Sequence, residues 1–196
     1  MMELRIVDYD PGWPAAFEAI KLVYKAHLGK LIIDIQHVGS TSVPGLGAKP
    51  VLDIDLVIDN MNVLPAIIQQ LGELGYIPLG EMGITGRYAF KQVLVPDNQL
   101  NPARNWPKHH LYVCEQHNVA LSNHLHFRDQ LRKDRKLATQ YGELKRSLAK
   151  NCTNMDEYVS GKTGFIVEVL KTAGLDEQSL KTIVQNNTSN QLGEIK

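Results

Sequence analysis

The chain has 196 residues, of which 43% are hydrophobic, so it is long and apolar enough for one domain with a sizeable core. Basic and acidic residues each number 21, and this balance gives no indication of a nucleic acid or a membrane surface as partner. The sequence has no apolar run of membrane length and no signal-peptide pattern near Met1. Cys114 and Cys152 do not have the spacing of metal ligands. We therefore expect a cytoplasmic protein with reduced thiols.

The N-terminal half alternates helical and strand patterns. Helical spacing of apolar residues predicts two helices, over residues 17–28, ending at Gly29, and over residues 64–71. Strand patterns occupy residues 31–38, 51–58, 84–95 and 111–114, and the sequence already becomes β-like from Tyr76. A Pro- and Asn-rich loop is expected over residues 96–108. Strands first mixed with helices and then meeting in hairpins predict an α+β fold, a mixed β-sheet with helices packed mainly on one face.

The C-terminal third is helical. Apolar residues with a period near 3.6 run from Phe127 to Leu148, and a last helix carries Tyr158 and Leu170 on its apolar side. Beyond Gly174, the polar tract over residues 185–191 is expected to fray because it buries too little apolar surface. The predicted organisation is therefore one domain over residues 1–175 and a polar tail over residues 176–196.

The strongest chemical signal lies in a loop and the strand that follows it. An apolar run stops at Gly39 and Ser40, whose backbone N–H groups and hydroxyl suit an anion, as in phosphate-binding loops. Asp53 and Asp55 then lie inside a strand, where Asp is rare, and alternation puts both on one face.

Two neighbouring carboxylates repel each other unless a proton or a cation lies between them. Mg²⁺ meets this need, because it takes one or two carboxylates and completes its shell with water and substrate phosphates. Asp53, Asp55 and the Gly39 turn together therefore indicate metal-assisted phosphoryl transfer. The alternative is that the two aspartates only occupy a solvent-facing strand end.

The same residues carry a family resemblance. The string from His37 to Leu46, followed by Lys49-Pro50 and then by Asp53-Ile54-Asp55, resembles the GrpB family, a branch of the polymerase-beta-like nucleotidyltransferase superfamily. The resemblance extends from about Val7 to Ala173. It implies a nucleotidyltransferase-like fold, a turn at Gly39 and Ser40 that holds nucleotide phosphates, and Mg²⁺ or Mn²⁺ on Asp53 and Asp55.

Basic side chains are the next candidates. Residues 127–150 hold eight Lys or Arg against three acids, which favours either a solvated basic face or a polyphosphate cleft lined by Arg128, Arg132 and Arg135. Strings around Arg128 and Lys145 also resemble the family. Lys91 shares a strand face with Arg87. This face is expected either to form a polar sheet edge or to face the two aspartates. The candidate phosphate ligands are Gly39, Ser40, Thr41, Ser42, Lys49, Lys91, Arg128, Lys145 and Lys162.

A third carboxylate, which the superfamily supplies on a neighbouring strand, is hard to find here. Glu115 ends the strand that begins at His110, and its odd spacing from His110 turns it to the other face. His110 could instead act as a base near neutral pH, with Asp53 and Asp55 as the other catalytic residues.

The remaining histidines are expected to play no part in the chemistry: His109 is predicted at the surface, and His124 and His126 are interpreted as structural. Two functions stay open. One is a nucleotidyltransferase that uses a nucleoside triphosphate and an unidentified small-molecule or macromolecular acceptor. The other is a nucleotide- or polyphosphate-binding module without turnover.

Overall fold

The computed structural model describes residues 4–93 and 106–189, with side chains as far as residue 186. Most of the loop predicted over residues 96–108 therefore lies outside the described residues. In the part of the chain that is described, no helix is both long enough and apolar enough to span a membrane.

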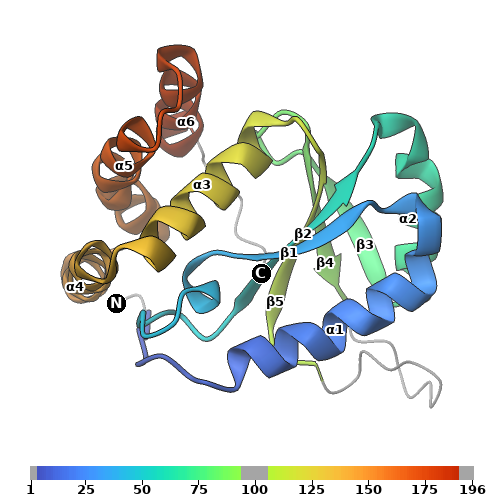
Figure 1. Cartoon of the computed structure of the whole chain (residues 1–196), viewed down its shortest axis with the longest axis horizontal. Coiled ribbons are helices and arrows are strands. Elements are labelled where there is room, and N and C mark those ends of the chain that lie inside the picture. Colours follow the sequence, from blue (N-terminus) through green and yellow to red (C-terminus); the bar gives the residue numbers. More distant parts are fainter. Residues whose placement is uncertain (1–3, 94–105, 190–196) are drawn as a thin grey trace.

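A five-stranded mixed sheet forms the centre of the molecule (Figure 1). The strands are β1 (Asp34–Val38), β2 (Leu52–Ile58), β3 (Tyr76–Gly80), β4 (Arg87–Gln92) and β5 (His109–Glu115). Their order across the sheet is β1-β2-β5-β4-β3, in which β2 and β5 are parallel and all other neighbours are antiparallel. The predicted α+β fold with a mixed sheet is confirmed.

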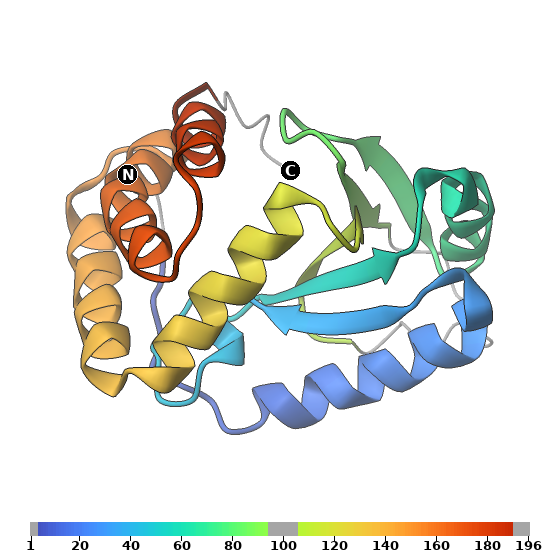
Figure 2. The same cartoon turned by 45° about the horizontal axis from the view of Figure 1, so that its top comes forward.

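Helices cover the sheet and extend beyond one end of it. They are α1 (Trp13–Leu28), α2 (Leu64–Glu73), α3 (Val119–Lys133), α4 (Arg135–Asn151), α5 (Met155–Thr172) and α6 (Glu177–Ser189). The main core joins α1 and α2 to one face of the sheet, where Ile54, Leu56 and Ile58 are completely buried. The opposite face is crossed by α3, and α4, α5 and α6 lie together at the end of the sheet near β1 (Figures 1 and 2).

Several boundaries differ from the sequence-based predictions. The strand β1 begins at Asp34 rather than at residue 31, because residues Gly29–Leu31 form a short 3-10 turn that starts at the positive φ of Gly29. Likewise, β4 begins at Arg87, after a turn in which Arg87 N–H donates to the Ile84 carbonyl.

The last described segment, which ends at Ser189, also contains more helix than predicted. The helix α6 continues to Ser189, so the expectation of a frayed tract is wrong for residues 185–189. Leu180 and Ile183 are buried against Leu170 of α5, and this apolar contact supports a helix whose later residues are polar.

Candidate functional site

The two aspartates lie on β2, on the face opposite the main core. Asp55 is completely buried, whereas the Asp53 side chain keeps 30% of its surface exposed. The parallel register pairs Asp53 with His110 and Asp55 with Tyr112 on β5, so these four side chains share one face of the sheet. The side-by-side arrangement expected from the alternation is the one observed.

Each carboxylate accepts a hydrogen bond from a histidine. His110 Nδ1 lies 2.9 Å from Asp53 Oδ1, and His124 Nδ1, on α3, lies 2.7 Å from Asp55 Oδ2. Because a carboxylate only accepts, both rings present Nδ1–H to it, which leaves Nε2 for other partners. The pKa of Asp53 is lower than that of a free aspartate, although burial alone would raise it. The hydrogen bond from His110 and the charge of His110 lower this pKa most, and the charges of His124 and His37 lower it further.

The Gly39 turn meets Asp53 directly. Gly39 has a φ of 67°, and a Cβ at this position would lie only 2.1 Å from Asp53 Oδ2. Only glycine therefore combines this backbone conformation with so close an approach of the carboxylate. A short 3-10 turn, Ser40–Ser42, follows Gly39.

The three hydroxyls of this turn have different partners. Ser40 Oγ accepts a hydrogen bond from Lys145 Nζ at 2.7 Å, across 105 positions of the sequence. Thr41 Oγ1 is hydrogen-bonded to His37 Nε2 at 3.0 Å, and Ser42 Oγ donates to the Gly39 carbonyl at 2.6 Å. The hydroxyls of Thr41 and Ser42 thus hold the turn together, while that of Ser40 contacts a cation from another element.

Lysines from two helices lie around Asp53. Lys145 of α4 is only 2% exposed. Burial lowers its pKa to about 7, and the charges of Lys162 and Arg146 add to this shift, while the charge of Asp53 opposes it. Burial likewise lowers the pKa of Lys162, on α5, to about 8, with Asp53 opposing and the nearby Lys49 adding to the shift. The structure therefore brings three predicted phosphate ligands to one region beside Asp53.

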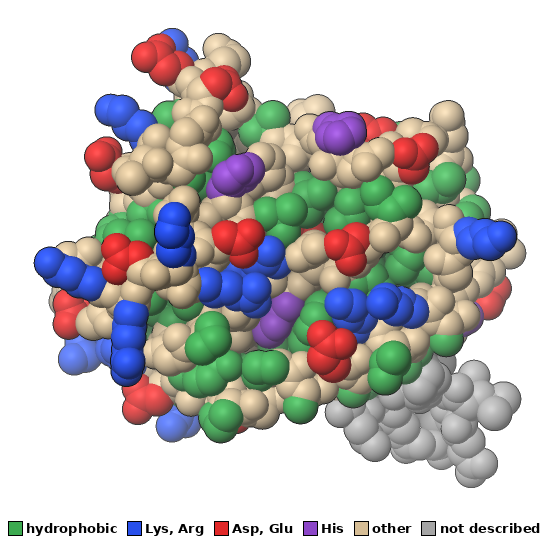
Figure 3. Space-filling model, in the orientation of Figure 1, with side chains coloured by type: hydrophobic (Ala, Val, Ile, Leu, Met, Phe, Trp, Pro, Cys, Tyr) green, Lys and Arg blue, Asp and Glu red, His purple; other side chains and the backbone are tan. Residues whose placement is uncertain are grey.

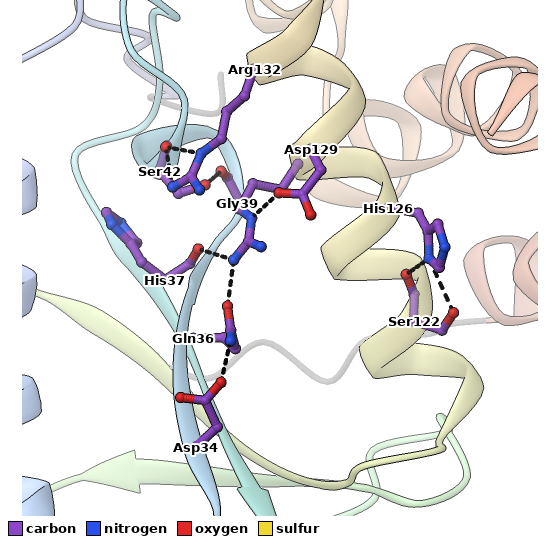
Figure 4. Close-up of polar contacts among 10 residues, drawn as sticks. Asp34, Gln36, His37, Gly39, Ser42, Ser122, His126, Asp129 and Arg132 are labelled. Atoms are coloured by element: carbon purple, nitrogen blue, oxygen red, sulfur yellow. Dashed lines mark hydrogen bonds and ion pairs between the residues drawn. The ribbon is translucent and has the colours of Figure 1, made fainter.

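Arg128 takes a different position from these lysines. It donates to the Gln36 side chain at 2.6 Å, to the His37 carbonyl at 3.1 Å and to Asp129 at 2.7 Å (Figure 4). Arg132 likewise donates twice to the Ser42 carbonyl, at 2.8 and 2.9 Å. Both arginines therefore bind carbonyl groups at the turn, whereas Lys145 binds the hydroxyl of Ser40.

Lys91 stays on the aspartate face but at a distance. Strand alternation puts it on the same side as Arg87 and Ala89 of β4, and β5 separates β4 from β2. Arg87 lies 4.3 Å above the ring of Tyr112, which stands between it and the aspartates. Lys91 therefore lies on a strand that does not adjoin the strand of Asp53.

The acid at the end of β5 is used elsewhere. Glu115 Oε1 accepts the Met61 N–H at 2.8 Å, so it supports the start of a 3-10 turn and does not reach Asp53. Among the described residues, no group of three or more His, Cys, Asp or Glu side chains is arranged to hold a metal ion. Asp55 Oδ1, however, is buried without a hydrogen-bond partner in the structure. The two carboxylates thus fit a hard cation whose other ligands come from water and phosphate.

His124 is the site residue that sequence reasoning missed. Its spacing from His126 correctly indicated that the two rings face different ways, since His126 turns to Ser122 (Figure 4). The available signal was its place at i+3 from Leu121, which is buried against the aspartate face of the sheet. A polar imidazole ring on the same buried face of α3 as Leu121 needs a hydrogen-bond partner, and Asp55 is that partner.

Comparisons with known proteins agree with this geometry. A family model described as GrpB protein matches residues 3–172. UPF0157 protein YqkA of Bacillus subtilis is 33% identical over 165 residues, which cover 84% of this chain and 45% of the relative, so the chain spans less than half of that protein.

The crystal structure of conserved protein GrpB from Enterococcus faecalis matches with a TM-score of 0.72 and 30% identity, over 86% of this chain and 96% of that one. A cytoplasmic RNA terminal U-transferase, at a TM-score of 0.39 and 14% identity over 71% of this chain and 44% of that one, is too distant to carry an argument.

Proposed function

The chain belongs to the GrpB family, and we propose that it is a metal-dependent nucleotidyltransferase acting on a nucleoside triphosphate and a small-molecule or macromolecular acceptor. The observation that carries this proposal is the contact between the Gly39 backbone and the Asp53 carboxylate. It joins a turn whose amides and hydroxyl suit an anion to a carboxylate pair that suits a cation. A phosphate-bound metal ion needs both.

Asp53 and Asp55 would hold Mg²⁺ or Mn²⁺, which when bound neutralises phosphate charge and polarises the reacting phosphorus centre. The unpartnered Oδ1 of Asp55 supports this role, because a buried oxygen without a hydrogen bond is unfavourable unless a ligand uses it. The carboxylates supply only part of an octahedral shell. A triphosphate bound at Ser40 would contribute the missing oxygens.

The lysines would bind the phosphates. Lys145 already donates to Ser40, and Lys49 lies close enough to Lys162 for its charge to lower the pKa of Lys162. Their depressed pKa values, about 7 for Lys145 and about 8 for Lys162, mean that an incoming anion stabilises the protonated amines and draws protons onto them. Binding of the triphosphate and charging of the lysines are therefore coupled.

His110 would act as the general base. Asp53 holds its Nδ1–H, so Nε2 is free to accept a proton, and 35% of the side chain is exposed to an arriving acceptor. In the proposed reaction, the acceptor hydroxyl gives its proton to Nε2 and its oxygen forms a bond to the α-phosphorus. The bond from that phosphorus to the bridging oxygen breaks, and pyrophosphate leaves with the electron pair.

A binding module without turnover is the second candidate. It is favoured by the bond between Glu115 and Met61, which commits the one acid at the end of β5 to a structural role. Under this proposal the same residues hold the metal and the triphosphate, but no nucleotidyl group is transferred. For either function we propose a cytoplasmic location, with which the free thiols of Cys114 and Cys152 agree.

Labelled transfer separates the two candidates. The protein is incubated with each nucleoside triphosphate labelled at the α-phosphate, with Mg²⁺ and a cell extract as the source of acceptor. The enzyme proposal predicts a labelled product that is absent with Asp53→Asn plus Asp55→Asn, and reduced about a hundredfold or more with His110→Asn. Triphosphate binding without any labelled product would favour the binding module.

A further inference from the structure

A second basic region lies along the free edge of the sheet. The end strand β1 borders a groove of about 840 Å³, whose walls come from α1, the Gly39 turn, α3 and the start of α4. Figure 3 shows Lys and Arg side chains gathered in a band across this face. Gln36, His37 and Ser42 form the floor that joins these walls.

The charge of the groove is strongly unbalanced. Four basic side chains line it, and Glu18 is the only acid among its lining residues; the basic residues are Lys21, Arg128, Arg132 and Arg135. Burial and the positive charge of Arg128 lower the pKa of Arg132, so the two guanidinium groups repel each other. An anion placed between them would relieve that repulsion.

The two central arginines are held in fixed positions. Arg132 is held by the Ser42 carbonyl, and Arg128 by the His37 carbonyl and the Gln36 amide oxygen, all of which are uncharged acceptors. Arg128 is also ion-paired with Asp129, which is 57% exposed and does not line the groove. Fixed guanidinium groups are suited to phosphate, whose oxygens match their fork of donors.

One wall of the groove is apolar and aromatic. Tyr9, Pro14 and Phe17 line it, and the Phe17 ring is stacked on His37 with a centroid separation of 4.7 Å. Burial, aided by Arg132 and Arg128 and opposed by Asp53, lowers the pKa of His37 to about 4, so its ring stays neutral beside this wall. A flat apolar group can therefore lie here while a phosphate lies at the arginines.

We propose that this groove binds an organic phosphate monoester, with its phosphate between Arg128, Arg132 and Arg135 and its ring against the more exposed Tyr9 and Pro14. The site is distinct from the lysines beside Asp53, since neither Lys145 nor Lys162 lines the groove. It does not depend on metal binding or on nucleotidyl transfer, and its ligand is a second molecule besides the triphosphate.

Phenyl phosphate is the probe, titrated into the full chain at low salt by calorimetry, with inorganic phosphate as the comparison ligand. The test variant is Lys21→Gln plus Arg135→Gln, which removes two groove charges and leaves the backbone bonds of Arg128 and Arg132 intact. The matched control is Lys133→Gln plus Lys136→Gln, two exposed lysines of α3 and α4 that do not line the groove.

Phenyl phosphate is expected to bind saturably and more tightly than inorganic phosphate. The groove variant is expected to weaken its binding about tenfold, with the control variant close to the wild type. Asp53→Asn should not weaken the binding, because Asp53 does not line the groove and its replacement removes a negative charge near His37. The proposal is overturned by an absence of saturable binding, by equal losses in the groove variant and the control variant, or by a loss in Asp53→Asn, which would move the ligand to the aspartate site.

Discussion

At the scale of single residues, the Asp53 carboxylate is the point where distant parts of the chain meet. Gly39 lies against one of its oxygens and His110 donates to the other. These three residues could be proposed from the sequence because glycine turns and strand alternation are local rules. His124 could not be assigned with equal ease, since its partner, Asp55, lies 69 positions away and only the path of α3 joins them.

Replacement of Gly39 by alanine tests the close approach to Asp53. Gly45 is the matched control, because it also has a positive φ, 79°, but a Cβ there would meet nothing within 4 Å. Gly45→Ala should lose only the backbone preference, about 1 kcal/mol of unfolding free energy, and Gly39→Ala about 2 kcal/mol more because its Cβ displaces a carboxylate. Denaturant unfolding measures both, and equal losses would contradict the packing described for Asp53.

The lysines predict a pH dependence of triphosphate binding. With pKa values lowered to about 7 and about 8, Lys145 and Lys162 are mostly charged at pH 6 and mostly neutral at pH 9. Since a triphosphate attracts the charged amines, its affinity should fall as the pH rises through this window, and binding at pH 8 should take up protons.

Calorimetry in buffers of different ionisation enthalpy counts those protons. Lys145→Met and Lys162→Met should each reduce the uptake, while Lys136→Met, a change at an exposed lysine, should not. Protonation of the triphosphate itself is common to all four proteins and cancels in the comparison. A proton uptake that is the same in every variant would show that these lysines do not contact the phosphates.

At the scale of elements, the sequence predicted the order of helices and strands better than their ends. The core strand β2 and the helix α1 were recognised because their apolar residues repeat with the correct period over several turns or pleats. The start of β1 was missed because Leu31, at the end of the 3-10 turn, and Ile32, just after it, are apolar and pack against the core although they precede the strand. The order of the strands depends on long-range pairing, which no local pattern records.

The last helix was missed for a related reason. Most of α6 is polar, and only two of its described side chains, Leu180 and Ile183, are buried. Leu180→Ala plus Ile183→Ala should therefore destabilise the protein by about 3 kcal/mol, because both lose apolar contact with Leu170. Lys181→Ala, an exposed change in the same turn, should have little effect. Thermal melts compare the two, and an equal small effect would mean that α6 adds no stability.

At the scale of the whole molecule, two groups of basic residues meet at the Gly39 turn. Lys145 of α4 donates to the Ser40 hydroxyl and Lys162 of α5 lies near Asp53, whereas Arg128 and Arg132 of α3 donate to the His37 and Ser42 carbonyls. The basic composition of residues 127–150 left a solvated basic face and a polyphosphate cleft open and did not predict this division. The division depends on how α3, α4 and α5 pack around the turn, which no local pattern records.

Calorimetric titration of Mn²⁺, with and without a non-hydrolysable nucleoside triphosphate, tests the central proposal most directly. Two carboxylates fill part of the metal shell, so Mn²⁺ should bind weakly alone and at least about tenfold more tightly with the triphosphate. Asp53→Asn plus Asp55→Asn should abolish that gain. The charge-matched control Asp8→Asn plus Asp156→Asn, at two exposed acids, should keep it. A metal affinity that is unchanged by the triphosphate, or by loss of Asp53 and Asp55, would contradict the metal and nucleotide site proposed for this protein.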